Sequence, residues 1–133
     1  MNIELFREYC LSLDEVEEKL PFAKMPGGDS VLAFYVGGHT FCYCDIDDFG
    51  TVIVKCQPER IPELLETDGI CPPDNHFNAK YWIGLDTKHL KAETLKELVA
   101  NSYEIAVGRR RPRNADNRRS RGLLDSENAN RIL

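Results

Sequence analysis

The chain has 133 residues, which is long enough for one domain with a single hydrophobic core, and its formal net charge is −5. Residues 1–108 carry 9 basic and 19 acidic side chains, a net of −10, whereas residues 109–133 carry 8 arginines and 3 acids, a net of +5. The sequence has neither a run of about 20 apolar residues nor a basic N-terminus followed by an apolar stretch, which argues against a membrane protein and a secretory signal.

The N-terminal segment predicts an amphipathic helix over about residues 3–13. Apolar side chains recur there at helical spacing, charged ones fall on the other side, and Asn2 is suited to cap the helix. In residues 14–23 apolar and charged side chains alternate instead, which favours a short strand. Because Pro21 cannot donate a backbone hydrogen bond, we expect this strand at the edge of a sheet.

Three consecutive runs in the first half of the chain are rich in the β-branched and aromatic residues typical of strands. They span Ser30–Val36, His39–Asp45 and Thr51–Cys56. Gly37-Gly38 joins the first two runs, and glycine readily adopts the positive φ that a tight hairpin requires. A turn rich in aspartate, residues 47–50, joins the second run to the third. The pattern predicts an antiparallel meander covered on one face by helices.

The second half of the chain predicts two further helices and another strand. Residues 57–60 are expected to open a helix that buries Leu65 with other apolar residues, since proline fits a first helical turn. Tyr81–Leu85 predicts a strand, and residues 92–107 predict a last helix. The fold class expected is therefore α+β: a two-layer arrangement with an antiparallel sheet packed by helices, followed by a disordered basic C-terminal tail.

We take residues 1–108 as the folded domain and residues 109–133 as a flexible tail, since the tail has almost no apolar content before Leu123. Its clustered arginines suit RNA, DNA or an acidic protein surface. Equally open is that the tail folds back onto its own acidic body, because opposite charges attract. The tail residues expected to contact nucleic acid are Arg109, Arg110, Arg111, Arg113, Arg118, Arg119 and Arg121.

The five cysteines are odd in number and lie mostly in apolar strands, which predicts reduced, buried thiols in a cytoplasmic protein. Cys42 and Cys44 fall on one strand face with His39 nearby, but this spacing does not match that of zinc sites. The acids of residues 45–48 are better suited to a hairpin turn than to a calcium loop. The sequence therefore predicts neither a metal nor a cofactor.

Several short motifs follow one another in order along the body of the chain. They are Phe6-Arg7-Glu8-Tyr9-Cys10-Leu11-Ser12-Leu13, Phe34-x-Val36-Gly37-Gly38, Lys55-Cys56-x-Pro58-Glu59-Arg60, His76-x-Asn78-x-Lys80-x-Trp82, and Leu95-Lys96-Glu97-Leu98 with Ser102-Tyr103-Glu104. As an ordered set they resemble the MmcQ/YjbR family of small bacterial proteins. The resemblance implies a two-layer α+β fold and a DNA-binding role. The acidic body departs from that role, because a negative domain repels nucleic acid at long range.

The most distinctive polar cluster is formed by His76, Asn78, Lys80 and Trp82. On the predicted strand, Lys80 and Trp82 point to one face, which would make Trp82 available for stacking and Lys80 for phosphate. The alternative, which we favour, is that Trp82 packs in the core and Asn78 caps a loop, since large aromatics are mostly packing residues. Together with Lys55, these four residues are the candidate nucleic-acid contacts of the domain.

No arrangement of serine, histidine and acid can be argued from the spacing, so we expect a non-enzymatic protein. The first hypothesis is weak nucleic-acid binding, mediated mainly by the tail. The second is an acidic scaffold that binds a protein partner, which would present an acidic or apolar surface. A contiguous basic surface that includes Lys55 and Lys80 would favour the first, and an exposed apolar patch would favour the second. A pocket with several convergent titratable groups would favour a third hypothesis, an enzyme.

Overall fold

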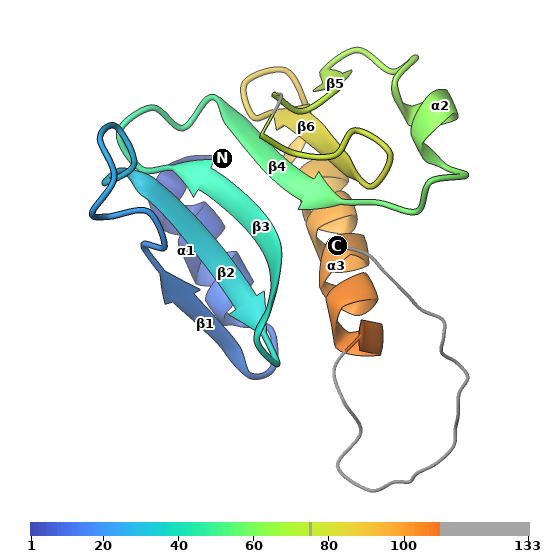
Figure 1. Cartoon of the computed structure of the whole chain (residues 1–133). Helices are drawn as coiled ribbons and strands as arrows, with labels where there is room; N and C mark the ends of the chain where they lie inside the picture. The colour runs from blue at the N-terminus through green and yellow to red at the C-terminus, as the bar shows by residue number, and fades with distance from the viewer. Residues whose placement is uncertain (75, 110–133) are drawn as a thin grey trace, which may run out of the picture.

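The computed structural model describes residues 1–74 and 76–109. Within them, six antiparallel strands form one sheet in the order β1-β2-β3-β4-β6-β5, and α1 and α3 cover one face (Figure 1). The elements are α1 Ile3–Leu11, β1 Val16–Lys19, β2 Val31–Val36, β3 His39–Asp45, β4 Thr51–Lys55, α2 Ile61–Leu64, β5 Ile70–Cys71, β6 Trp82–Asp86 and α3 Ala92–Arg109. The predicted α+β fold is confirmed, and the predicted tail, apart from Arg109, lies outside the described residues.

The N-terminal half follows the predicted elements closely. Asn2 caps α1, with its side-chain oxygen accepting a hydrogen bond from the Leu5 N–H at 2.9 Å. The alternating segment forms β1 at the edge of the sheet. Gly37 and Gly38 adopt φ of 59° and 81° in the hairpin between β2 and β3, the left-handed conformation that this turn requires.

Two expectations for the segment after β4 are wrong. The helix spans only Ile61–Leu64, with Pro62 rather than Pro58 in its first turn, and Leu65 is exposed rather than buried. The chain instead turns at Gly69, which has a φ of 93°, and enters the short strand β5 against β6. Pairing of β5 with β6 is a long-range contact, so the local pattern that suggested a longer helix does not contain it.

The hydrophobic core lies between the sheet and the two helices. Strand side chains alternate between the two faces, so Phe34, Val54 and Ile83 point toward the helices and are completely buried. Phe6 packs α1 against this layer. The centroid of its ring lies 6.1 Å from that of the Phe34 ring and 5.1 Å from that of the Phe49 ring. The opposite face of the sheet carries no helix, and it is the face seen in Figure 1.

Strands β3 and β4 separate at one end, and Ser102 of α3 occupies the fork. The two strands pair from Cys44 to Cys42, and beyond that point Phe41 bulges out of register with β2. The buried Ser102 hydroxyl accepts a hydrogen bond from the Lys55 N–H at 2.8 Å and donates one to the Phe41 carbonyl at 2.5 Å. One side chain thus satisfies two backbone groups that would otherwise pair across the ladder, and it fixes where β4 ends.

Four of the five cysteines are buried and Cys71 is exposed, and none of the five forms a disulfide. Burial raises the pKa of the Cys44 thiol to about 12. The pKa of Cys42 is also raised, first by burial and then by its hydrogen bond with Cys10. Since the thiolate is the reactive form, these two groups are poor nucleophiles at neutral pH.

We expect the native protein to react rapidly with iodoacetamide at pH 8 at one thiol, Cys71, and to expose the other four only on unfolding. The reason is that burial both blocks access to a thiol and disfavours its thiolate. Mass spectrometry after timed labelling, with and without denaturant, measures the number of modified sites. The Cys71→Ser variant is the control and should label slowly. Rapid labelling of Cys42 or Cys44 in the native protein would contradict the packing described above.

Candidate functional site

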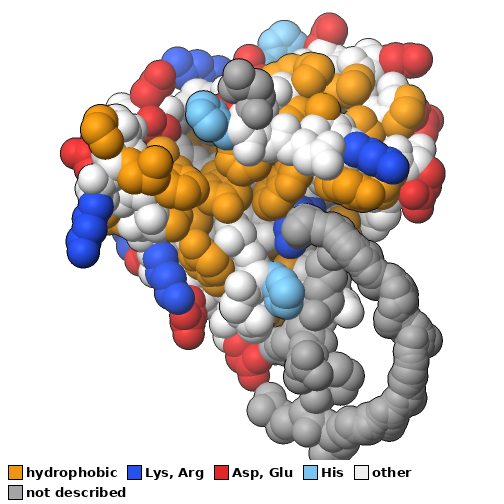
Figure 2. Space-filling view, viewed as in Figure 1, with side chains coloured by type: hydrophobic (Ala, Val, Ile, Leu, Met, Phe, Trp, Pro, Cys, Tyr) orange, Lys and Arg blue, Asp and Glu red, His pale blue; other side chains and the backbone are white. Residues whose placement is uncertain are grey.

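A groove of about 740 Å³ lies on the sheet face that the helices leave open. Its floor is formed by β3, β4 and β6, and its two walls are the loop of residues 22–28 and the loop of residues 74–78, except Asn75, which is not described. Figure 2 shows hydrophobic side chains gathered across this face, with lysines and acids mostly toward its rim. The groove is larger than the cavity beside α1 and β1, and it is open to solvent.

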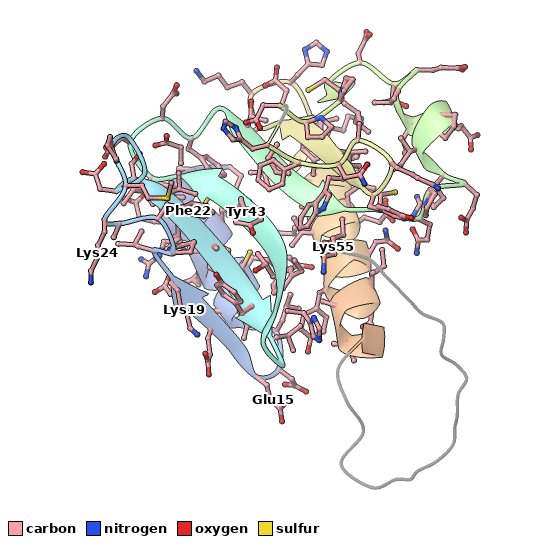
Figure 3. The ribbon with its side chains drawn as sticks, in the orientation of Figure 1. Glu15, Lys19, Phe22, Lys24, Tyr43 and Lys55 are labelled. Carbon is pink, nitrogen blue, oxygen red and sulfur yellow. The ribbon has the colours of Figure 1, made fainter. Side chains whose placement is uncertain are left out.

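Four aromatic rings surround the groove, with Tyr43 at their centre. The Tyr43 ring stacks nearly parallel to that of Phe22, with an interplanar angle of 12° and centroids 6.3 Å apart (Figure 3). Its centroid lies 4.9 Å from that of Phe77 and 5.7 Å from that of Trp82, and the last two rings are 5.4 Å apart. A residue of β3 therefore anchors both walls, and the rings present flat apolar surface to a ligand.

The first wall is a compact run of turns. Its backbone is closed by hydrogen bonds from the Met25 N–H to the Phe22 carbonyl at 3.0 Å and from the Gly28 N–H to the Met25 carbonyl at 2.9 Å. A Cβ atom on Gly28 would lie 2.4 Å from the Phe22 carbonyl oxygen, so glycine is required for this close approach. The wall holds Phe22 against the floor of the groove.

Side-chain oxygens hold the second wall together. Asp74 accepts a hydrogen bond from the His76 N–H at 2.9 Å, and its carboxylate lies 3.2 Å from Nδ1 of His76. The Asn78 side-chain oxygen accepts a hydrogen bond from the Lys80 N–H at 3.0 Å, and the Asn78 backbone carbonyl accepts one from the Trp82 N–H at 3.1 Å. These bonds place Phe77 over the groove, and they agree with the interpretation that Asn78 caps a loop.

Lys55 supplies a positive charge to the groove. It pairs with Trp82 across β4 and β6, and its ammonium lies 5.5 Å from the centroid of the indole ring, in a cation–π contact. Its side chain runs over apolar surface, and only 9% of the residue is exposed. Of the described residues that line the groove, Asp74 alone is acidic, and it is engaged with His76. The described lining of the groove therefore lacks the excess of negative charge that the body as a whole carries.

The groove brings together four of the five domain residues predicted from the sequence: Lys55, His76, Asn78 and Trp82. The expectation that Lys80 shares a strand face with Trp82 is wrong, because residues 79–81 form a turn and β6 begins at Trp82. The Lys80 ammonium instead lies over the Tyr81 ring, 5.6 Å from its centroid. Trp82 is 9% exposed, so it packs in the structure as we favoured, with one part of the indole facing the groove.

Three contributors to the groove, Phe22, Tyr43 and Phe77, are missing from the sequence prediction. A signal for Tyr43 is present, since it alternates with the buried Cys42 and Cys44 and must therefore face away from the helices. No sequence signal places Phe22 and Phe77 beside it, because both lie in loops. The predicted arginines cannot be placed relative to the groove. Arg109 ends α3, and the other six lie outside the described residues.

The groove offers a ligand its aromatic rings, the Lys55 ammonium and the Asp74–His76 pair. Among residues 1–74 and 76–109, no group of three or more histidines, cysteines, aspartates and glutamates is placed to hold a metal ion. No helix of that part of the chain has the length and apolar character needed to cross a membrane. A second cavity, of about 550 Å³, lies beside α1 and β1, where the Arg7 Nε donates a hydrogen bond to Glu18 at 2.9 Å. Two of its charged groups, those of Arg7 and Glu18, are thus paired with each other.

Comparison with known proteins agrees with this fold. The YjbR family model matches residues 11–105. A crystal structure of the Deinococcus radiodurans protein DR2400, with the domain DUF419, has a TM-score of 0.73 and 27% identity, covering 84% of this chain and 83% of that one. A Pseudomonas syringae protein has 21% identity over 80% of this chain. Its crystal structure has a TM-score of 0.66, with 99% of that chain covered, and its solution structure has a TM-score of 0.63, with 93% of that chain covered. The last two show the fold alone.

No curated protein matches this chain. The family match covers well over half of the 133 residues, from the end of α1 to the last turns of α3. It includes the whole sheet and every residue that lines the groove. This chain therefore belongs to the YjbR family, as the order of its motifs indicated.

Proposed function

We propose that the protein binds single-stranded nucleic acid without catalysing a reaction, and that the groove receives an unpaired base. The observation that carries this proposal is the cluster of rings around Tyr43. Unpaired bases stack on aromatic side chains, and each such contact contributes about 1–3 kcal/mol to binding. A base in a duplex has both faces covered by its neighbours, so the groove should favour single strands.

The charges fit a strand whose phosphates are bound by Lys55 at the groove and by the arginines of the tail. The body as a whole has a net charge of −10 and repels phosphate, but the described residues that line the groove include Lys55 and only one carboxylate, that of Asp74, which lies 3.2 Å from Nδ1 of His76. Residues 109–133, with eight arginines and three acids, add a net charge of +5. A volume of about 740 Å³ lies within the range of pockets that hold small organic ligands, so one nucleotide is a suitable occupant.

We expect Phe77→Leu to weaken binding of a single-stranded oligonucleotide by about 5- to 100-fold, because the variant keeps apolar volume but loses a stacking surface. Fluorescence anisotropy at fixed salt measures the affinity. Trp82 is the one tryptophan of the chain, so quenching of its emission reports directly on occupation of the groove. Binding of duplex DNA should change little in the same variant.

Tyr35→Leu is the matched control for this experiment. Tyr35 lies on the same sheet face, under the Lys19 ammonium, but it does not line the groove. The control should bind the oligonucleotide as the wild type does. If Phe77→Leu and Tyr35→Leu bind equally well, the base is not held in the groove and the proposal fails.

A second candidate, the interaction scaffold, is favoured by one observation. The first wall exposes apolar side chains, with Met25 59% and Phe22 36% accessible. Such side chains suit the apolar surface of a protein partner. The groove contains only one of the two lysines expected to form a basic surface under the first hypothesis, because Lys80 does not line it and lies over the Tyr81 ring. If neither single strands nor duplexes bind at low salt, the scaffold becomes the better interpretation.

A further inference from the structure

The rings of Phe22 and Tyr43 are the pair in the groove that lie in nearly the same orientation (Figure 3). Their interplanar angle is 12°, whereas the Tyr43 ring is tilted by 60° to that of Phe77 and by 53° to that of Trp82. Phe77 and Trp82 are also tilted to each other by 53°. A flat ligand cannot lie parallel to two rings that are tilted so strongly. A base that stacks on two of these four rings at once must therefore lie between Phe22 and Tyr43.

The two rings are too close together to hold a base between them as they stand. Stacked bases are about 3.4 Å apart, so a base with a ring on each face needs about 6.8 Å between the two ring planes. The centroids of Phe22 and Tyr43 are 6.3 Å apart, and the separation of two nearly parallel planes cannot exceed that of their centroids. Entry of a base therefore requires the first wall to move outward by about half an ångström or more.

The first wall can make this movement without losing a hydrogen bond to the floor of the groove. Within the described part of the chain, residues 22–28 exchange hydrogen bonds only with residues 20–31, and none with β3, β4, β6 or the second wall. Phe22 is 36% exposed, and its ring contact with Tyr43 joins the wall to the floor. Separation of the two rings thus breaks an apolar contact, which a base inserted between them restores on both of its faces.

We propose that Phe22 is a clamp: the first wall opens to admit a base and then closes, with Phe22 on one face of the base and Tyr43 on the other. The inference rests on the proposed function, since it concerns the occupant of the same groove. It restricts the ligand to a flat aromatic group with both faces free, which an unpaired base has and a base stacked in a duplex lacks. The tilted ring of Phe77 is then left to a neighbouring base of the strand.

The test compares Phe22 variants by their affinity for oligo-dT, measured by fluorescence anisotropy at one salt concentration. Phe22→Leu keeps apolar volume but loses the ring, and we expect it to weaken binding by about 5- to 100-fold. Phe22→Tyr is the matched control, because it keeps the ring, and it should bind as the wild type does. Circular dichroism of each variant checks that the sheet and helices are retained.

Gly28→Ala tests the same ring from a second position. Gly28 does not have a positive φ, so its backbone accepts alanine, but a Cβ atom there would lie 2.4 Å from the carbonyl oxygen and 2.7 Å from the Cβ of Phe22. The substitution therefore displaces Phe22. It should weaken binding in the wild type and change little in Phe22→Leu, where no ring is left to displace. A merely structural effect of Gly28→Ala would be equal in both backgrounds and would contradict the clamp.

The outcomes separate the clamp from the proposed function. If Phe77→Leu weakens binding and Phe22→Leu does not, the base stacks on the second wall alone, so the clamp is wrong and the proposed function stands. Tighter binding by Phe22→Leu also overturns the clamp, because Phe22 would then compete with the base for Tyr43. If both variants bind as the wild type does, or if the wild type does not bind oligo-dT at low salt, both proposals fail.

Discussion

Phe6→Ala is expected to lower the free energy of unfolding by about 3–5 kcal/mol, the range measured for removal of a buried phenyl ring. Phe6 is 1% exposed and contacts Phe34 and Phe49 beneath the sheet. It is the ring through which α1 joins the core, and neighbouring side chains cannot fill the space without moving the helix. Chemical denaturation of the 133-residue chain, monitored by circular dichroism, measures the effect.

Leu5→Ala is the matched control for this variant. Leu5 precedes Phe6 in the same helix, but 51% of it is exposed. Its replacement should cost less than about 1 kcal/mol, because little apolar contact is lost and alanine is a good helix former. Similar losses for the two variants would show that α1 does not pack on the sheet through the face described.

Removal of residues 109–133 is expected to abolish most of the salt dependence of binding to single-stranded nucleic acid. Each arginine that meets a phosphate releases counterions, so five to eight contacts give a log–log slope of roughly −3.5 to −5.5 on a single strand. The remaining body has a net charge of −10 and little to offer phosphate apart from Lys55. Anisotropy across a salt series, with the full chain and a chain ending at Gly108, measures both slopes.

A chain ending at Gly122 is the control for length, since it keeps seven of the eight arginines of residues 109–133. It should retain most of the slope of the full chain. At low salt, contacts between the arginines and the acidic body compete with nucleic acid for the tail. Under physiological ionic strength the range of that attraction falls to about 8 Å, so the competition weakens. If the chain ending at Gly108 binds as tightly as the full chain and with the same slope, the tail is incidental and the groove carries the affinity.

The elements of this fold that follow from local patterns are determined by the sequence itself. Alternation of apolar side chains specifies β2, β3 and β4, because the period of two matches the pleat. Gly37 and Gly38 specify the hairpin, because the turn needs two residues at positive φ. Helical spacing and the Asn2 cap specify α1. Each of these signals acts over a few residues, and for that reason each can be read without the tertiary structure.

The groove was decided by contacts between residues far apart in the chain. Tyr43 in β3 meets Phe22 from one loop and Phe77 from another, and no local propensity relates these three positions. The same holds for Lys55, whose backbone is fixed by Ser102 of α3 where β3 and β4 separate. Packing of side chains after the sheet has formed, rather than backbone preference, sets these neighbours. The sequence by itself thus determined the main strands of the sheet and the helices α1 and α3, whereas the tertiary structure decided the pairing of β5 and which aromatic and polar side chains share one groove.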